Sequence, residues 1–170
     1  GQFLKFTGTT TVASAASGIN QFDVWGLSST NTVSSGEQTL TGWGRLTSRS
    51  RATEGSAMTE SSGVFTFPVT GKYLITGNFY SDGYTSTNYR GIQLKNNSNQ
   101  VLQVSYSHGK GSNPSWDHCC VSLNTILDVT DTTDNACKVK FMPNSGGATT
   151  WSGSSDDGQA TMLFIKLADT

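Results

Sequence analysis

Apolar and polar residues alternate with a period of two in many short stretches of this chain. Leu102, Val104 and Tyr106 are separated by polar residues, as are Ile92 and Leu94. Because successive side chains of a strand point to opposite faces, each stretch predicts a strand with one dry and one wet face. No window carries the apolar spacing of three and four that a helix requires. Clusters of Gly, Asn, Asp and Ser separate the stretches, and this cadence predicts an all-β sandwich or barrel.

Ten segments fit the alternation or are rich in β-branched and aromatic residues. Pro68 and Gly71 predict a turn between two of them, which would pair as an antiparallel hairpin. We expect strands near Gln2–Thr7, Gln21–Trp25, Thr39–Leu46, Val64–Phe67, Lys72–Tyr80, Tyr89–Lys95, Val101–Ser107, Cys119–Val129, Ala136–Met142 and Thr161–Leu167.

Two of these segments are apolar toward both faces, namely Met162–Ile165 and the run that begins at Tyr73. A strand that is apolar on both faces is covered on both faces. We expect a second subunit to supply the outer cover; the alternative is that the N-terminal arm, residues 1–43, folds back over it. The residues expected at the subunit interface are Tyr73, Ile75, Phe79, Met162 and Phe164.

Length and charge restrict the class of protein. A chain of 170 residues fits one domain. Charged residues make up 14% of it and the net charge is −1, so there is no basic surface for nucleic acid or an anionic membrane. No apolar stretch approaches the roughly 20 residues that cross a bilayer. The chain starts at Gly1 without an initiator Met, and we interpret this start as the cut end of a longer polypeptide.

The three cysteines form a poor disulfide framework, because their number is odd and Cys119 and Cys120 are adjacent. Adjacent strand residues point to opposite faces, so these two should not share a partner. We expect all three to be reduced, with Cys119 and Cys137 as small core residues. This indicates synthesis in a reducing cytoplasm.

The segment from Gly63 to Tyr73 contains the pattern Gly-x-Phe-x-x-Pro-x-x-Gly-x-Tyr. It resembles a strand pair of the tumour necrosis factor and complement globular-head family. The stretch Met58–Pro68 and the ending Phe164–Thr170 are also similar to jelly-roll modules in structural proteins of tailed phages, especially marine and cyanobacterial ones. Ala57 stands where those modules have a glycine.

The resemblance covers roughly Leu40 to Thr170 and implies a two-sheet antiparallel jelly-roll sandwich that forms a homotrimer. We therefore expect residues 40–170 to be the jelly roll. Residues 1–39 match no pattern of the family, and we expect them to be a strand-containing arm or connector packed on that domain.

Catalytic motifs are missing, which argues against an enzyme. No Gly-x-Ser-x-Gly elbow occurs, and the only histidines, His108 and His118, lie beside polar turns. A zinc site would draw on His118, Cys119 and Cys120, with His108 or Cys137 as a further ligand, but no Cys-x-x-Cys or His-x-His spacing supports it.

We expect no cofactor. Asp156 and Asp157, together with Asp131 and Asp134 in another turn, are weak candidates for calcium ligands, because carboxylate oxygens suit this ion. The favoured interpretation is that they are solvated turn acids.

Loops between the predicted strands gather aromatic and polar side chains, which could hold a sugar by ring stacking and hydrogen bonds. The alternative is that Trp116 only seals the end of a sheet. The predicted ligand-binding residues are Tyr84, Tyr89, His108, Asn113 and Trp116.

These observations predict a non-enzymatic structural and binding module of a phage particle, made in the host cytoplasm and displayed on the virion surface. The expected place is the tip of a fibre or appendage, where a homotrimer contacts other virion proteins and a host surface polysaccharide. A capsid decoration or assembly protein is one alternative, and an extracellular lectin-like, complement-type domain is another.

Overall fold

The computed structural model describes residues 5–7, 10–12, 19–34, 37–48, 51–82, 89–107, 118–145, 147–154 and 158–170. A 3-10 helix at Asn135–Cys137 lies between two strands, and the other elements of this part are β-strands. The strands are β1 (Lys5–Thr7), β2 (Thr10–Val12), β3 (Phe22–Leu27), β4 (Asn31–Val33), β5 (Trp43–Arg45), β6 (Thr59–Ser61), β7 (Val64–Thr66), β8 (Gly71–Asp82), β9 (Arg90–Asn96), β10 (Val101–Ser107), β11 (His118–Val129), β12 (Val139–Ser145), β13 (Thr149–Trp151) and β14 (Ala160–Ala168).

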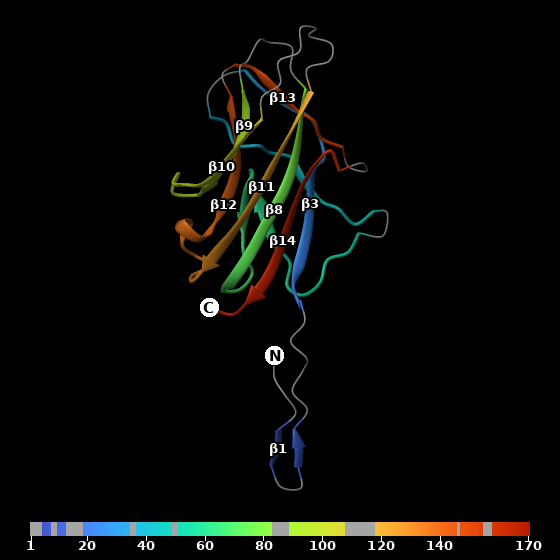
Figure 1. Cartoon of the computed structure of the whole chain (residues 1–170), viewed down its shortest axis with the longest axis vertical. Coiled ribbons are helices and arrows are strands. Elements are labelled where there is room, and N and C mark those ends of the chain that lie inside the picture. Colours follow the sequence, from blue (N-terminus) through green and yellow to red (C-terminus); the bar gives the residue numbers. More distant parts are fainter. Residues whose placement is uncertain are drawn as a thin grey trace.

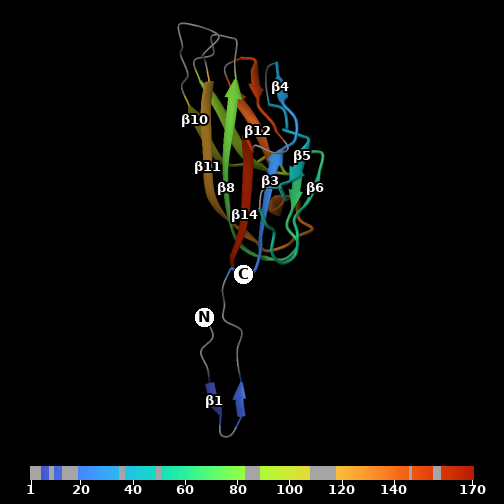
Figure 2. The same ribbon diagram turned by 90° about the vertical axis from the view of Figure 1, so that its right-hand side faces the viewer.

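Two antiparallel sheets form the sandwich. The smaller has the order β10-β9-β12-β7-β6, and the larger has the order β4-β13-β8-β14-β3-β5 with β11 also paired to β8. Figure 1 shows the long strands β11, β8, β14 and β3 side by side, and Figure 2 shows β5 beside β3 at the edge of this sheet. The chain passes repeatedly from one sheet to the other, and this jelly-roll arrangement confirms the predicted fold class. Strands β1 and β2 pair with each other.

An aromatic core joins the two sheets. Phe65 of β7 lies 5.4 Å from Trp25 and 5.1 Å from Phe164, which belong to the opposite sheet, and 5.7 Å from Phe141 of its own sheet, between ring centroids. These separations are typical of attractive aromatic pairs. Trp43 packs against the same cluster, so Trp25 and Trp43 are core residues.

The turn at Pro68–Gly71 lies where it was predicted, but it does not close a hairpin. β7 pairs with β6 and β12, while β8 belongs to the other sheet. Phe67 and Tyr73 approach to 4.5 Å across the core, so the turn carries the chain from one layer to the other. The hairpin at this place is β6–β7, whose turn at Ser62 and Gly63 has positive φ at both residues, as a two-residue hairpin turn requires.

The jelly roll begins before residue 40, the position predicted for its N-terminal boundary. β3 and β4 are strands of the larger sheet, and their Trp25, Leu27 and Val33 are core residues. The jelly roll therefore begins within the segment that was expected to be an arm. The pattern missed β2, β4, β6 and β13, because strands of three residues have too few positions to show alternation. Residues 136–137, predicted as strand, lie in the 3-10 helix.

A buried carboxylate ties three segments together. Asp23 on β3 is 2% exposed, and its oxygens accept hydrogen bonds from Arg45 Nε at 2.8 Å and Nη2 at 3.1 Å. Asp23 also accepts a bond of 3.0 Å from the backbone N–H of Met58, while Arg45 donates one of 2.8 Å to the Met58 carbonyl. The Arg45 guanidinium lies 4.6 Å from the centre of the Trp25 ring. The network therefore positions the segment before β6 against β3 and β5.

Replacing Asp23 with Ala should lower the free energy of unfolding by about 2 to 4 kcal/mol, because it leaves Arg45 Nε and the Met58 N–H without their acceptor and removes the counter-charge of Arg45. Urea unfolding followed by tryptophan fluorescence measures this. Asp128→Ala, at an exposed position of β11, is the control and should change stability by less than about 0.5 kcal/mol. Equal stability of the two variants would contradict the role given to Asp23.

Candidate assembly face and ligand surface

The five residues predicted at the subunit interface are core residues instead. Their side chains are at most 1% exposed within one chain, so a neighbouring copy cannot reach them. Strands β8 and β14 do carry apolar residues on both faces, as predicted, but the side chains of these five residues point inward. A charge at Phe164 would therefore disrupt the fold and would not test assembly. The residues concerned are Tyr73, Ile75, Phe79, Met162 and Phe164.

The outward half of the same pattern forms an apolar row across four strands. Ile165 of β14 lies opposite Phe22 of β3 on one side and Leu74 of β8 on the other. Leu74 in turn lies opposite Ile126 of β11, whose side chain is 61% exposed. Phe22, Ile165 and Leu74 are only partly buried. We call these four residues the apolar row.

Polar side chains occupy the neighbouring part of this face. Thr76 and Asn124 are hydrogen bonded across β8 and β11, and Ser122 donates to Asn78 at 2.7 Å. Beside them lies a hollow of about 340 Å³, lined by Val24, Arg51, Thr76, Gly77, Asn78, Thr161, Met162 and Leu163. Along β8 and β11 the face thus changes from apolar to polar, while Val24 and Leu163 keep it apolar on β3 and β14.

Most of the predicted ligand-binding residues, Tyr84, His108, Asn113 and Trp116, lie outside the described residues, as do the calcium candidates Asp156 and Asp157. Tyr89 is described, and it directly precedes β9. Its ring meets the ring of Tyr106 on β10 edge to face, at 5.4 Å and 88°. Tyr106 is not among the predicted site residues, although its place two residues before the predicted loop puts it beside them.

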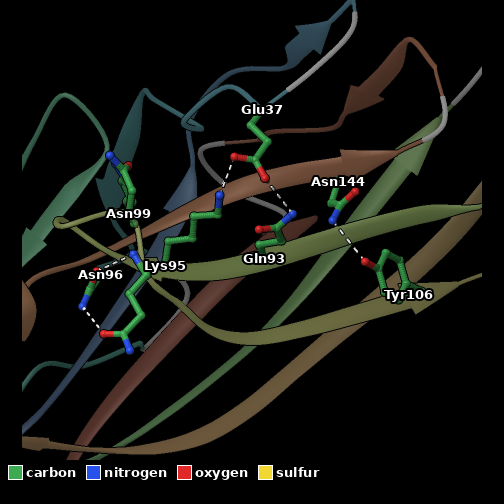
Figure 3. A network of polar contacts seen from close by, with 9 residues as sticks. Glu37, Gln93, Lys95, Asn96, Asn99, Tyr106 and Asn144 are labelled. Atoms are coloured by element: carbon green, nitrogen blue, oxygen red, sulfur yellow. Dashed lines mark hydrogen bonds and ion pairs between the residues drawn. The ribbon is translucent and has the colours of Figure 1, made fainter.

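Polar contacts extend over the outer face of the smaller sheet (Figure 3). Glu37, from the segment before β5, binds the ammonium group of Lys95 and accepts a bond of 3.1 Å from the Gln93 amide. Lys140 on β12 donates to Asn99 at 2.6 Å. Because Lys95 is 6% exposed while Glu37 lies at the surface, the Glu37 carboxylate covers a nearly buried charge.

The hydrogen bond from Lys95 is the main reason that the pKa of Glu37 lies below its ordinary value of 4.5. The native state then binds this proton less tightly than the unfolded chain does, so the contribution of Glu37 to stability is present above pH 4.5 and is lost as the pH falls through the lowered pKa.

We expect the free energy of unfolding to fall as the pH drops below about 4.5 and through the lowered pKa, and Glu37→Gln to remove part of that fall because the amide does not titrate. Urea unfolding across this range measures both proteins. Glu54→Gln, at an exposed position, is the control and should follow the wild type. A Glu37→Gln profile parallel to the wild type at every pH would contradict the assignment.

The residues considered for metals have other roles where the structure describes them. Asp131 accepts hydrogen bonds from the Thr133 N–H and hydroxyl, which lower its pKa, and Asp134 caps the 3-10 helix. The described ranges hold no group of three His, Cys, Asp or Glu side chains arranged for a metal. Within the same ranges, no helix has the length and apolar character to cross a membrane.

Cys119 and Cys137 are buried, as predicted, while Cys120 is exposed. All three are present as thiols. The Cys119 and Cys137 side chains belong to the core cluster, where thiols behave as small apolar groups.

Comparison with solved structures supports the fold. The Eiger tumour necrosis factor of S. frugiperda superposes with a TM-score of 0.64 at 14% identity, over 88% of this chain and 94% of that one. Murine APRIL gives 0.56 at 12% identity, over 86% and 100%. The vertex protein P5 of phage PRD1 gives 0.56 at 14% identity, over 89% and 99%. No protein-family model matches the chain, and no curated protein matches it by sequence.

Proposed function

We propose that this chain is a non-enzymatic structural and binding module of a phage particle, that it assembles as a homotrimer, and that it meets a glycan of the host surface. The observation that carries the proposal is the apolar row on the outer face of the larger sheet. Phe22, Ile165, Leu74 and Ile126 lie side by side there, each on a different strand.

The apolar row supports assembly because apolar surface gains free energy when another subunit removes it from water. The described residues leave Ile126 mostly exposed and the rest of the row only partly covered. Burial of this row alone does not specify how many copies meet. The number three comes from the family that the Gly63–Tyr73 pattern resembles.

The place on a particle surface is supported by two independent features. The module resembles jelly rolls of tailed-phage structural proteins in sequence, and its fold is similar to that of a vertex protein of phage PRD1. The three cysteines are free thiols, which suits a protein made in a reducing cytoplasm.

A trimer would display three identical weak sites at high effective concentration, which favours repeated contact with a surface polymer.

Capsid decoration is the second candidate, favoured by the same likeness to a vertex protein. It shares the fold and the trimer but needs no glycan. Binding of the purified protein to host cells, competed by their surface polysaccharide, would support the fibre-tip role. Stoichiometric binding to empty capsids without glycan binding would support decoration.

The assembly proposal predicts that the wild-type protein has the mass of three chains in size-exclusion chromatography with light scattering. Ile126→Asp should shift it toward one chain, because three charges would meet where the apolar row is buried. Val101→Asp is the matched control, since Val101 is 49% exposed but lies on β10 of the other sheet. It should leave the mass unchanged.

Far-ultraviolet circular dichroism establishes that both variants keep the fold. A monomeric wild-type protein would contradict the trimer. Separation of subunits by Val101→Asp, with Ile126→Asp unaffected, would place the contact on β10 and overturn the assignment to the apolar row.

A further inference from the structure

Tyr106 is a half-exposed aromatic residue whose ring is held in place. It lies opposite Gly91 on the neighbouring strand, and the ring fills the space that a side chain at Gly91 would need. A Cβ atom added there would lie 2.4 Å from Tyr106 Cδ1 and 2.7 Å from Cε1, so the ring and any larger residue at position 91 exclude each other. Nevertheless 49% of Tyr106 faces solvent.

Two further contacts fix the same ring. Its hydroxyl accepts a hydrogen bond of 3.0 Å from the side-chain amide of Asn144 on β12 (Figure 3). The Tyr89 ring meets it edge to face. The hydroxyl proton of Tyr106 is not used in the bond from Asn144, so it can be donated to a ligand. A rigid ring with a polar group at its rim loses little conformational entropy on binding.

The surroundings of the ring are apolar along β10. Val104 and Val101, on the same face of β10, are 39% and 49% exposed. Lys95 and Lys140 lie on the same face of the adjoining strands, where the Lys95 ammonium group is paired with Glu37 and Lys140 donates to Asn99 at 2.6 Å. The groups beside the ring that can bind a ligand, the Tyr106 hydroxyl and the Asn144 amide, carry no charge, so they suit a neutral ligand.

We propose that Tyr106, flanked by Asn144 and Tyr89, is a stacking platform for a neutral pyranose. The apolar C–H face of the sugar lies on the exposed ring face, and its hydroxyl groups exchange hydrogen bonds with the Tyr106 hydroxyl and the Asn144 side chain. This site rests on the glycan recognition proposed above, and it specifies the sugar class and the residues. It lies on the sheet opposite to the apolar row, so assembly leaves it accessible.

The test uses the full chain on a panel of immobilised polysaccharides, one group built from neutral hexoses and N-acetylhexosamines and one rich in uronic acids. We expect binding to a neutral polymer. Tyr106→Ala should weaken that binding by about tenfold per site, the scale of one aromatic contact. Tyr106→Phe keeps the ring over Gly91 and should retain most of the binding.

Val104→Ala is the matched control, because it removes another exposed apolar side chain of β10 and should bind like the wild type. Light scattering of Tyr106→Ala should give the wild-type mass; a lower mass would make Tyr106 a contact between copies and overturn the platform. Neutral-glycan binding that survives Tyr106→Ala, or binding to acidic polymers alone, would overturn the platform while leaving glycan recognition intact. Failure of the wild type to bind any polysaccharide would overturn both.

Discussion

The period of two along β8 and β14 is the constraint on which the rest of the structure depends. Residues 73, 75 and 79 of β8 point inward with residues 162 and 164 of β14, and they pack against the aromatic cluster of the other sheet. The same geometry forces Leu74 and Ile165 outward. When both sets are apolar, the inward set forms the core. The outward set, on the same two strands, forms a surface whose burial against a second subunit would be favourable. The fold, and the assembly proposed for this surface, both follow from one alternation.

The core alone does not hold the long connections of a jelly roll in place. In the described part of this chain, two ion pairs help to do so. Asp23 and Arg45 attach the segment around Met58 to the edge formed by β3 and β5. Glu37 attaches the segment before β5 to Lys95 of the other sheet. The Glu37–Lys95 pair and the bonds to Met58 join different parts of the fold, so they form only once those parts are correctly placed. They favour one arrangement of the layers, which apolar packing by itself specifies less strictly.

The sequence predicts the long strands well because each offers several alternating positions. The predicted Val101–Ser107 has the observed bounds, and Cys119–Val129 differs by one residue. Which strands pair with one another was harder to predict from the sequence. Pro68 and Gly71 mark a turn, but whether the chain pairs with itself or crosses to the other sheet depends on where Phe67 and Tyr73 find partners, which is a property of the whole core. The interface prediction had the same limit: two apolar faces can be recognised locally, but which of them is the inner one follows from tertiary packing.

Tyr106 illustrates why a site on a sheet is harder to find from sequence than a site in a loop. In sequence it is the third member of an alternating set with Leu102 and Val104, and the alternation gives all three the same role. Only the pairing with Gly91 and the bond from Asn144 distinguish it, and these partners come from β9 and β12. Its fixed position and its exposure are the two features on which the proposed recognition site depends.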